Sequence, residues 1–250
     1  FLLGKKTRLK IRMKNLRLRA NIILPSLALG LSTSIMQASE SVISVCFNSS
    51  LLRYGGDIAV GAMTILTSVM QFAMLPLQGL GQGAQPIISY NFGAQNAGRV
   101  KDAFKLLLKA SLCYSVLLWA LVMAFPQLFA ALFTTDPALL EFTKTALRIY
   151  MACLLLFGVQ VACQMTFTAL GNAPASIIVA VMRKFVLLLP LIFLLPQIFT
   201  SGQTTAVYLA EPVADFFAVS FTAVLFTFQF KRALKKIDGG KKRAGARDTN

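Results

Sequence analysis

Six stretches of this sequence are long and apolar enough to cross a lipid bilayer. A membrane helix needs about 20 mostly apolar residues to span the hydrocarbon. Only 14% of the 250 residues are charged and 56% are hydrophobic, too few charges to cover a soluble surface of this size. We therefore predict an all-α, polytopic membrane protein with six transmembrane helices, at residues 20–51, 58–88, 106–132, 147–170, 175–199 and 205–230.

The basic residues predict the orientation of these helices. Eight of the 25 lie in residues 1–19 and eight in residues 231–250. With both ends on the cytoplasmic side, 22 basic residues face the cytoplasm and three, Arg53, Lys144 and Arg148, face outside, as the positive-inside rule requires. We expect a multi-pass protein of the bacterial cytoplasmic (inner) membrane, with residues 1–19 as a basic cytoplasmic linker and residues 231–250 as a basic cytoplasmic tail.

The net charge of +16 follows from these flanks. They adjoin apolar runs and do not form a surface of interleaved basic and aromatic residues, so we expect contact with anionic lipid head groups and no nucleic-acid partner. The sequence has no histidine and no P-loop motif, and its four cysteines form no metal-type pair. We therefore expect no enzyme activity, no metal site built from histidine or cysteine, and no cofactor other than a coupling Na⁺ or H⁺ ion.

Acidic residues inside the predicted helices are the first candidates for function. An ionised group in the bilayer interior costs a few kcal/mol or more, so it usually has a partner or a task. Glu40 lies deep in the first helix and Asp215 in the sixth, and each could bind a cation, a proton or a substrate, or make a structural hydrogen bond. Glu211 shares a helix face with Asp215 but is expected at a solvated helix start.

Polar amides and one arginine complete the candidate set. The amides could line a substrate cavity or make hydrogen bonds between helices. Arg183 lies about two turns into the fifth helix on the cytoplasmic side. It could reach the head groups, or pair in an inner gate with a loop carboxylate or backbone carbonyls. The candidate cavity amides are Gln37, Gln71, Gln78, Gln160 and Gln164.

The segment from Leu77 to Val100, LQGLGQGAQPIISYNFGAQNAGRV, resembles the eighth helix and following loop of multidrug and toxic compound extrusion (MATE) transporters. Further similar pieces occur in family order between about Asn21 and Phe230. They look most like the bacterial branch related to DNA-damage-inducible and staphylococcal multidrug members. These pieces are Asn48, LLRYGGD at 51–57, LFTTD at 132–136, LRI at 147–149, ALG at 169–171, RKF at 183–185 and PVAD at 212–215.

The resemblance implies a fold of twelve helices in two lobes around a central cavity. MATE proteins extrude cationic and lipophilic drugs in exchange for sodium or protons. This chain would be the C-terminal lobe, helices seven to twelve, and its partner would be an N-terminal six-helix lobe that this chain lacks. Sodium-coupled members of another branch carry acids in helices seven and ten. Here Glu40 lies at a different position, and residues 147–170 hold no carboxylate.

Two alternatives to drug antiport remain open from the sequence. One is a lipid-linked precursor flippase of the same superfamily, whose site usually carries several basic residues, where this sequence offers Arg183. The other is a truncated membrane protein without transport of its own.

Overall fold

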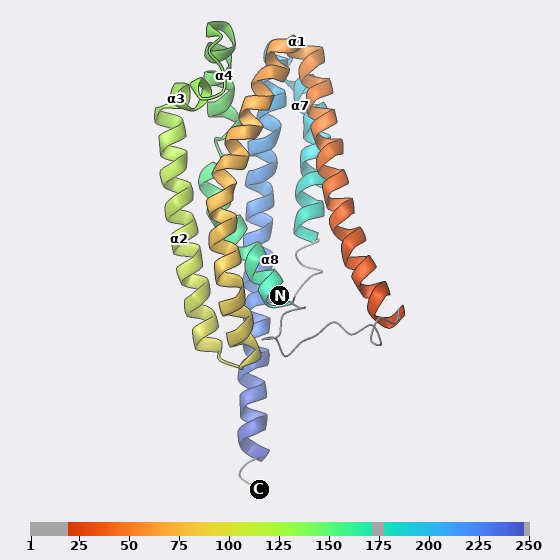
Figure 1. The fold of residues 1–250 in the computed structure, drawn as a ribbon, viewed down its shortest axis with the longest axis vertical. Coiled ribbons are helices and arrows are strands. Elements are labelled where there is room, and N and C mark those ends of the chain that lie inside the picture. Colours follow the sequence, from red (N-terminus) through yellow and green to blue (C-terminus); the bar gives the residue numbers. More distant parts are fainter. Residues whose placement is uncertain (1–19, 172–177, 248–250) are drawn as a thin grey trace, which may run out of the picture. The chain divides into compact units, whose positions relative to one another are not determined.

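The chain folds into helices throughout the part that the structure describes (Figure 1). The computed structural model describes the backbone of residues 20–171 and 178–247, and side chains within 38–171 and 178–235, Ser201 excepted. Residues up to Ser44 form one unit and those from Val45 onward a second. The helices are α1 (Ala20–Gly93), α2 (Ala97–Ala124), α3 (Pro126–Ala131), α4 (Pro137–Tyr150), η2 (Leu154–Leu156), α5 (Phe157–Ala169), η3 (Met182–Leu188), α7 (Leu189–Ile198), η4 (Thr200–Gly202) and α8 (Gln203–Arg247).

Within the described residues, four helical segments are long and apolar enough to span a membrane, and a bent pair, α4 with η2–α5, makes a fifth candidate. The longest segment, Ala38–Gly93, has 56 residues and would extend about 84 Å as a straight helix. It is broken at Gly56, whose φ of 66° and ψ of −164° are not helical. This break divides α1 into two crossings, and the count becomes six. The predicted all-α, six-helix membrane lobe is confirmed.

Two of the predicted apolar runs contain a break or a bend. The run 106–132 contains the end of α2, a break at Phe125 and the short helix α3, which begins at Pro126 because proline cannot donate a bond within a continuing helix. The run 147–170 contains a bend of 43° between α4 and η2–α5.

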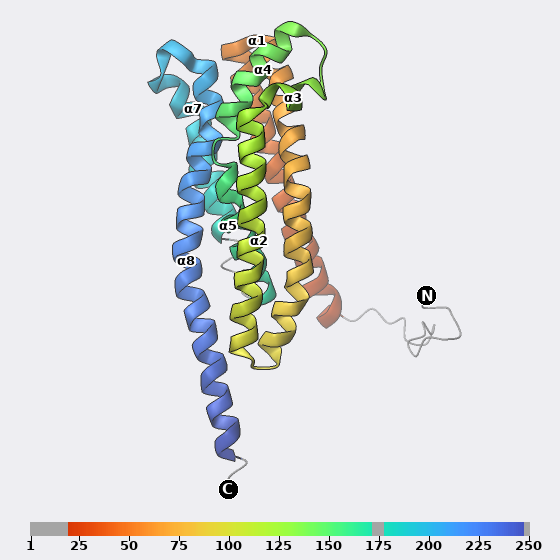
Figure 2. The same ribbon diagram turned by 90° about the vertical axis from the view of Figure 1, so that its left-hand side faces the viewer.

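The bend between α4 and α5 is held by donors from α2. Trp119 Nε1 donates to the carbonyl of Ala152 at 3.0 Å, and Ser115 Oγ donates to the carbonyl of Leu155 at 3.0 Å. Lipid offers no hydrogen bonds, so carbonyls at a break in a membrane helix need protein partners. Figure 2 shows α2 running beside α5. The packing there is tight, since a Cβ on Gly158 would lie 2.5 Å from the carbonyl oxygen of Ser111.

The break at Gly56 is held in the same way by α8. Thr204 Oγ1 donates to the carbonyl of Tyr54 at 2.8 Å, and the buried Tyr208 hydroxyl donates to the carbonyl of Ala59 at 2.7 Å. A Cβ on Gly55 would lie 2.6 Å from Thr204 Cγ2, so glycine permits this close approach. The first turns of α8 are thereby fixed against the backbone of α1.

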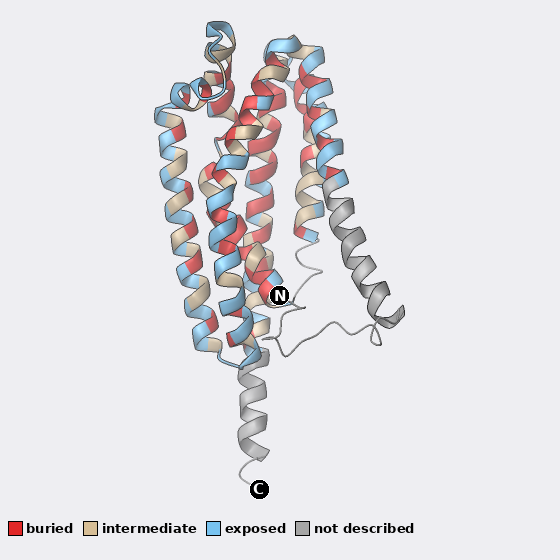
Figure 3. Cartoon of the chain, in the orientation of Figure 1, coloured by how far each residue is buried: buried red, intermediate tan, exposed pale blue. Residues whose placement is uncertain are grey.

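Farther along α8, an aromatic cluster joins α2, α5 and α8. Phe226 contacts Phe104, Phe167 and Phe230, with ring centroids 4.6, 5.3 and 4.9 Å apart. Aromatic pairs of this geometry add to the stability gained from burial. Figure 3 shows buried residues concentrated on α5 and along α8, between the surrounding helices. The C-terminal helix is therefore anchored at two levels.

We expect Tyr208→Phe to lower the melting temperature of the purified protein. The substitution keeps the ring and leaves a buried carbonyl without its donor, at a cost of about 1–3 kcal/mol. Tyr90→Phe is the matched control, since Tyr90 is 76% exposed. Equal melting temperatures for the two variants would show that the bond to Ala59 does not stabilise the break.

Candidate functional site

A half-buried arginine holds two carboxylates between η3 and α8. Arg183 Nε donates to Asp215 Oδ1 at 2.6 Å, and Arg183 Nη2 donates to Glu211 Oε1 at 2.9 Å. The side chains of Asp215 and Glu211 are 3% and 9% exposed, and that of Arg183 is 20% exposed. Charge-assisted bonds of this kind are the strongest hydrogen bonds in proteins. We call these three residues the charge cluster.

Local helix geometry brings the three groups together. Glu211 and Asp215 are four residues apart in α8, so they lie on one face of the helix. Arg183 lies in η3, a π-helical turn between Met182 and Leu188. Such turns are rare and often occur at functional sites. The planar guanidinium can serve two acids at once because its donors point in different directions.

An aromatic ring from a third element packs on the arginine. The guanidinium carbon of Arg183 lies 5.2 Å from the ring centroid of Phe157. Phe157 is the first residue of α5, directly after the bend that Trp119 and Ser115 hold. The ring face attracts the cation and excludes water and lipid from one side of it. The bend in the α4–α5 span therefore helps to position the charge cluster.

The charge cluster carries one surplus negative charge when all three groups are ionised. Two carboxylates bond to one guanidinium, and the ammonium of the neighbouring Lys184 attracts Glu211 electrostatically without an ion pair to it. An unbalanced charge in a membrane interior is costly. Lys184 offsets part of this charge from outside the cluster, and one proton or one monovalent cation would neutralise the three residues themselves.

The structure revises two expectations about these residues. Arg183 was expected to contact a loop carboxylate, backbone carbonyls or lipid head groups. It pairs instead with two carboxylates on a membrane helix. Glu211 was expected at a solvated helix start, and it is buried. The four-residue spacing of two acids, together with an arginine in the preceding helix, was the signal that could have identified the pair.

The other candidate residues differ in how far they are buried. Glu40 is exposed on α1 in the first unit, and the side chain of Gln37 lies outside the described residues. Gln160 is buried on α5, and its Oε1 has no hydrogen-bond partner among the described residues. Gln164 is half-buried on the same helix.

The predicted amides Gln71 and Gln78 are exposed and belong to a polar stripe on the second arm of α1. Steps of seven residues keep side chains near one helix face. The hydroxyls of the stripe bond to carbonyls of their own helix, whereas the structure gives its amides no partner within the described residues. Amides that face hydrocarbon would be costly, so this face needs water or another protein surface. The polar stripe consists of Thr64, Ser68, Gln71, Gln78, Gln82 and Gln85.

The MatE family model matches residues 32–194 of this chain, about two thirds of it. The chain belongs to the MatE family. The predicted membership among multidrug and toxic compound extrusion proteins is thereby confirmed. The match ends before α8, so Glu211 and Asp215 lie outside the matched residues, while Arg183 lies within them.

Known proteins match this MatE chain over most of its length. It is 27% identical over 198 residues to the multidrug export protein MepA of Staphylococcus aureus (strain NCTC 8325 / PS 47), which is 79% of this chain and 43% of MepA. A MATE crystal structure in the bent conformation matches with a TM-score of 0.79 and 19% identity over 93% of this chain and 51% of that one. An outward-facing multidrug resistance MATE transporter of the MOP superfamily matches with a TM-score of 0.79 and 20% identity. This match covers 94% of this chain and 52% of that one.

The MatE chain thus spans about half the length of the relatives that it matches. The structural matches show that its fold is that of MATE transporters. Together with its membrane helices, they make it a multi-pass membrane protein.

We expect Arg183→Gln to destabilise this MatE lobe by about 3–5 kcal/mol, because it leaves two buried carboxylates without their cation. The triple variant R183Q/E211Q/D215N should recover most of the melting temperature, since it removes all three charges together. Arg53→Gln, which alters an exposed arginine, should change little. A triple variant no more stable than R183Q would contradict this account.

Proposed function

We propose that this chain is the C-terminal six-helix lobe of a secondary active multidrug exporter, which exchanges cationic or lipophilic drugs for protons or sodium. Its family membership and its 27% identity to a multidrug export protein support this proposal. The chain spans 43% of that relative, which fits one of two lobes. The partner would then be an N-terminal six-helix lobe.

The surplus negative charge of the charge cluster is the observation that carries the proposal. A buried acid pair with one arginine attracts a cation, and binding that cation removes the cost of the unbalanced charge. A proton, a sodium ion or a cationic drug would compete for the same charge. Coupling requires that the cation binds one conformation of the transporter better than the other.

The polar stripe supplies a wall for the drug cavity. Its amides face away from the lobe core and can accept and donate hydrogen bonds. A second lobe facing this side of α1 would enclose them with the drug and water. Gln160, with an unpartnered oxygen, is a further acceptor that a substrate or an ordered water could use.

We favour drug export over transport of lipid-linked precursors. A site for a diphosphate-bearing lipid needs cations that are available to bind it. Arg183 already binds two carboxylates, so the cluster presents negative charge. We place the protein in the bacterial cytoplasmic membrane with both termini in the cytoplasm, because the basic residues concentrate at the two ends.

Glu211→Gln and Asp215→Asn should each lower ethidium efflux by the intact transporter at least tenfold. Each variant removes the surplus charge and leaves Arg183 one acid, so the fold and the membrane level should persist. Efflux is measured in cells that lack their main drug pumps.

Glu141→Gln and Asp102→Asn are matched controls, because both acids are exposed. Efflux from membrane vesicles under an imposed proton or sodium gradient identifies the coupling ion. Wild-type efflux by both E211Q and D215N would remove the charge cluster from the transport mechanism.

A further inference from the structure

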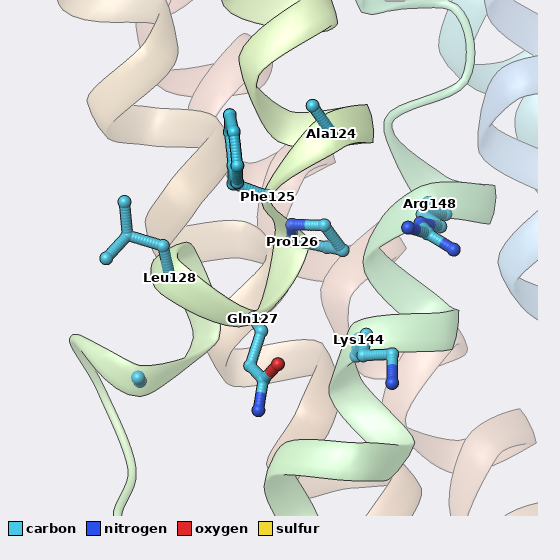
Figure 4. A pocket seen from close by; sticks show the side chains of 8 residues that line it. Ala124, Phe125, Pro126, Gln127, Leu128, Lys144 and Arg148 are labelled. Atoms are coloured by element: carbon cyan, nitrogen blue, oxygen red, sulfur yellow. The ribbon is translucent and has the colours of Figure 1, made fainter.

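A hollow lies at the corner where α2 ends and α3 approaches α4. Its volume is about 440 Å³. Figure 4 shows Lys144 and Arg148 on one side of it, from α4, facing Pro126 and Gln127 from α3. The two cations are four residues apart and share a helix face. The lining residues are Ala124, Phe125, Pro126, Gln127, Leu128, Ala131, Lys144 and Arg148.

The span lengths place this hollow at the edge of the hydrocarbon. The span Ala97–Ala124 ends where the hollow begins. On the other side, Leu154–Ala169 rises only about 24 Å, less than the roughly 30 Å of a bilayer core. The hydrocarbon boundary therefore falls near the last turn of α4, at the level of Arg148. Lys144 lies one turn farther out, among the head groups.

Lys144 and Arg148 are both available to bind an anion. Arg148 has no ion pair among the described residues. Lys144 pairs with Glu141 at 3.0 Å, and Glu141 is largely exposed, so this bond is weak and easily exchanged. The sequence predicts only three basic residues on this side of the membrane, and two of them meet at this hollow.

Large apolar side chains near the hollow, on the side of α2 and α3, remain exposed. Phe125 is 59% exposed, Leu128 64% and Leu132 73%. Apolar side chains at the boundary suit acyl chains and would be poorly placed around a small water-soluble anion. The hollow thus offers positive charge at head-group level and apolar surface next to it.

We propose that this hollow binds an anionic glycerophospholipid, with its phosphodiester between Lys144 and Arg148 and its acyl chains against Phe125 and Leu128. The site is distinct from the charge cluster, which lies between η3 and α8. It needs no transport activity and would tether the α2–α4 corner to the leaflet at this end of the lobe.

Binding of fluorescent phosphatidylglycerol and phosphatidylcholine to the purified intact transporter tests the proposal. The wild type should prefer phosphatidylglycerol, and K144Q/R148Q should bind it at least tenfold more weakly, since each basic residue near a membrane surface adds to the attraction for anionic lipid. Arg53→Gln is the matched control, because it removes the third predicted outer charge away from the hollow and should keep full affinity. Glu141→Gln frees Lys144 from its ion pair and should strengthen binding.

The variant K144R/R148K keeps both positive charges and should retain the preference for phosphatidylglycerol. This result would show that the weaker binding of K144Q/R148Q comes from lost charge and not from misfolding. Equal phosphatidylglycerol affinity of K144Q/R148Q and the wild type would overturn the proposal. Displacement of the lipid by soluble glycerol phosphate at equal concentration would also overturn it, since the site would then bind a free anion.

Discussion

The structure depends on one constraint, that a polar group inside the bilayer must find its partner within the protein. The α4–α5 bend shows how this lobe meets it, because the carbonyls there accept hydrogen bonds from Ser115 and Trp119 of α2. The turn at Gly56, between the two crossings of α1, is held by similar bonds from Thr204 and Tyr208 of α8. Each break is thus a point where two helices are joined, and the broken helices contribute to the packing of the lobe.

The charge cluster applies the same constraint to ionised groups. Arg183 can stay inside the lobe because two acids surround it and Phe157 covers it. Among these three residues one negative charge remains, and Lys184 offsets only part of it from outside the cluster. This remaining charge would let the ion network respond to a cation. Removing one member of such a network lowers stability more than removing all of its members together. The ion pairs that stabilise the network therefore also make it sensitive to charge.

Much of this could be predicted from the sequence. Apolar runs revealed the membrane helices, and the rarity of acids in them singled out Asp215. Glu211 was missed because its closeness to a helix start suggested solvation, and only the packing of α8 against η3 shows it buried. The bend at residues 151–153 has neither proline nor glycine in it, and its stability depends on Trp119 and Ser115, which are distant in sequence.

The sequence by itself determined the class of protein, because hydrophobicity and the scarcity of charge act through composition and spacing along the chain. It also carried the family resemblance between Asn21 and Phe230. The tertiary structure decided which polar groups meet. Whether Arg183 reaches head groups or carboxylates depends on a π-helical turn and on the face that α8 presents to it, and neither is fixed by local sequence. Partner choice among buried charges is a property of helix packing, since each pairing requires two helices at a particular rotation and height.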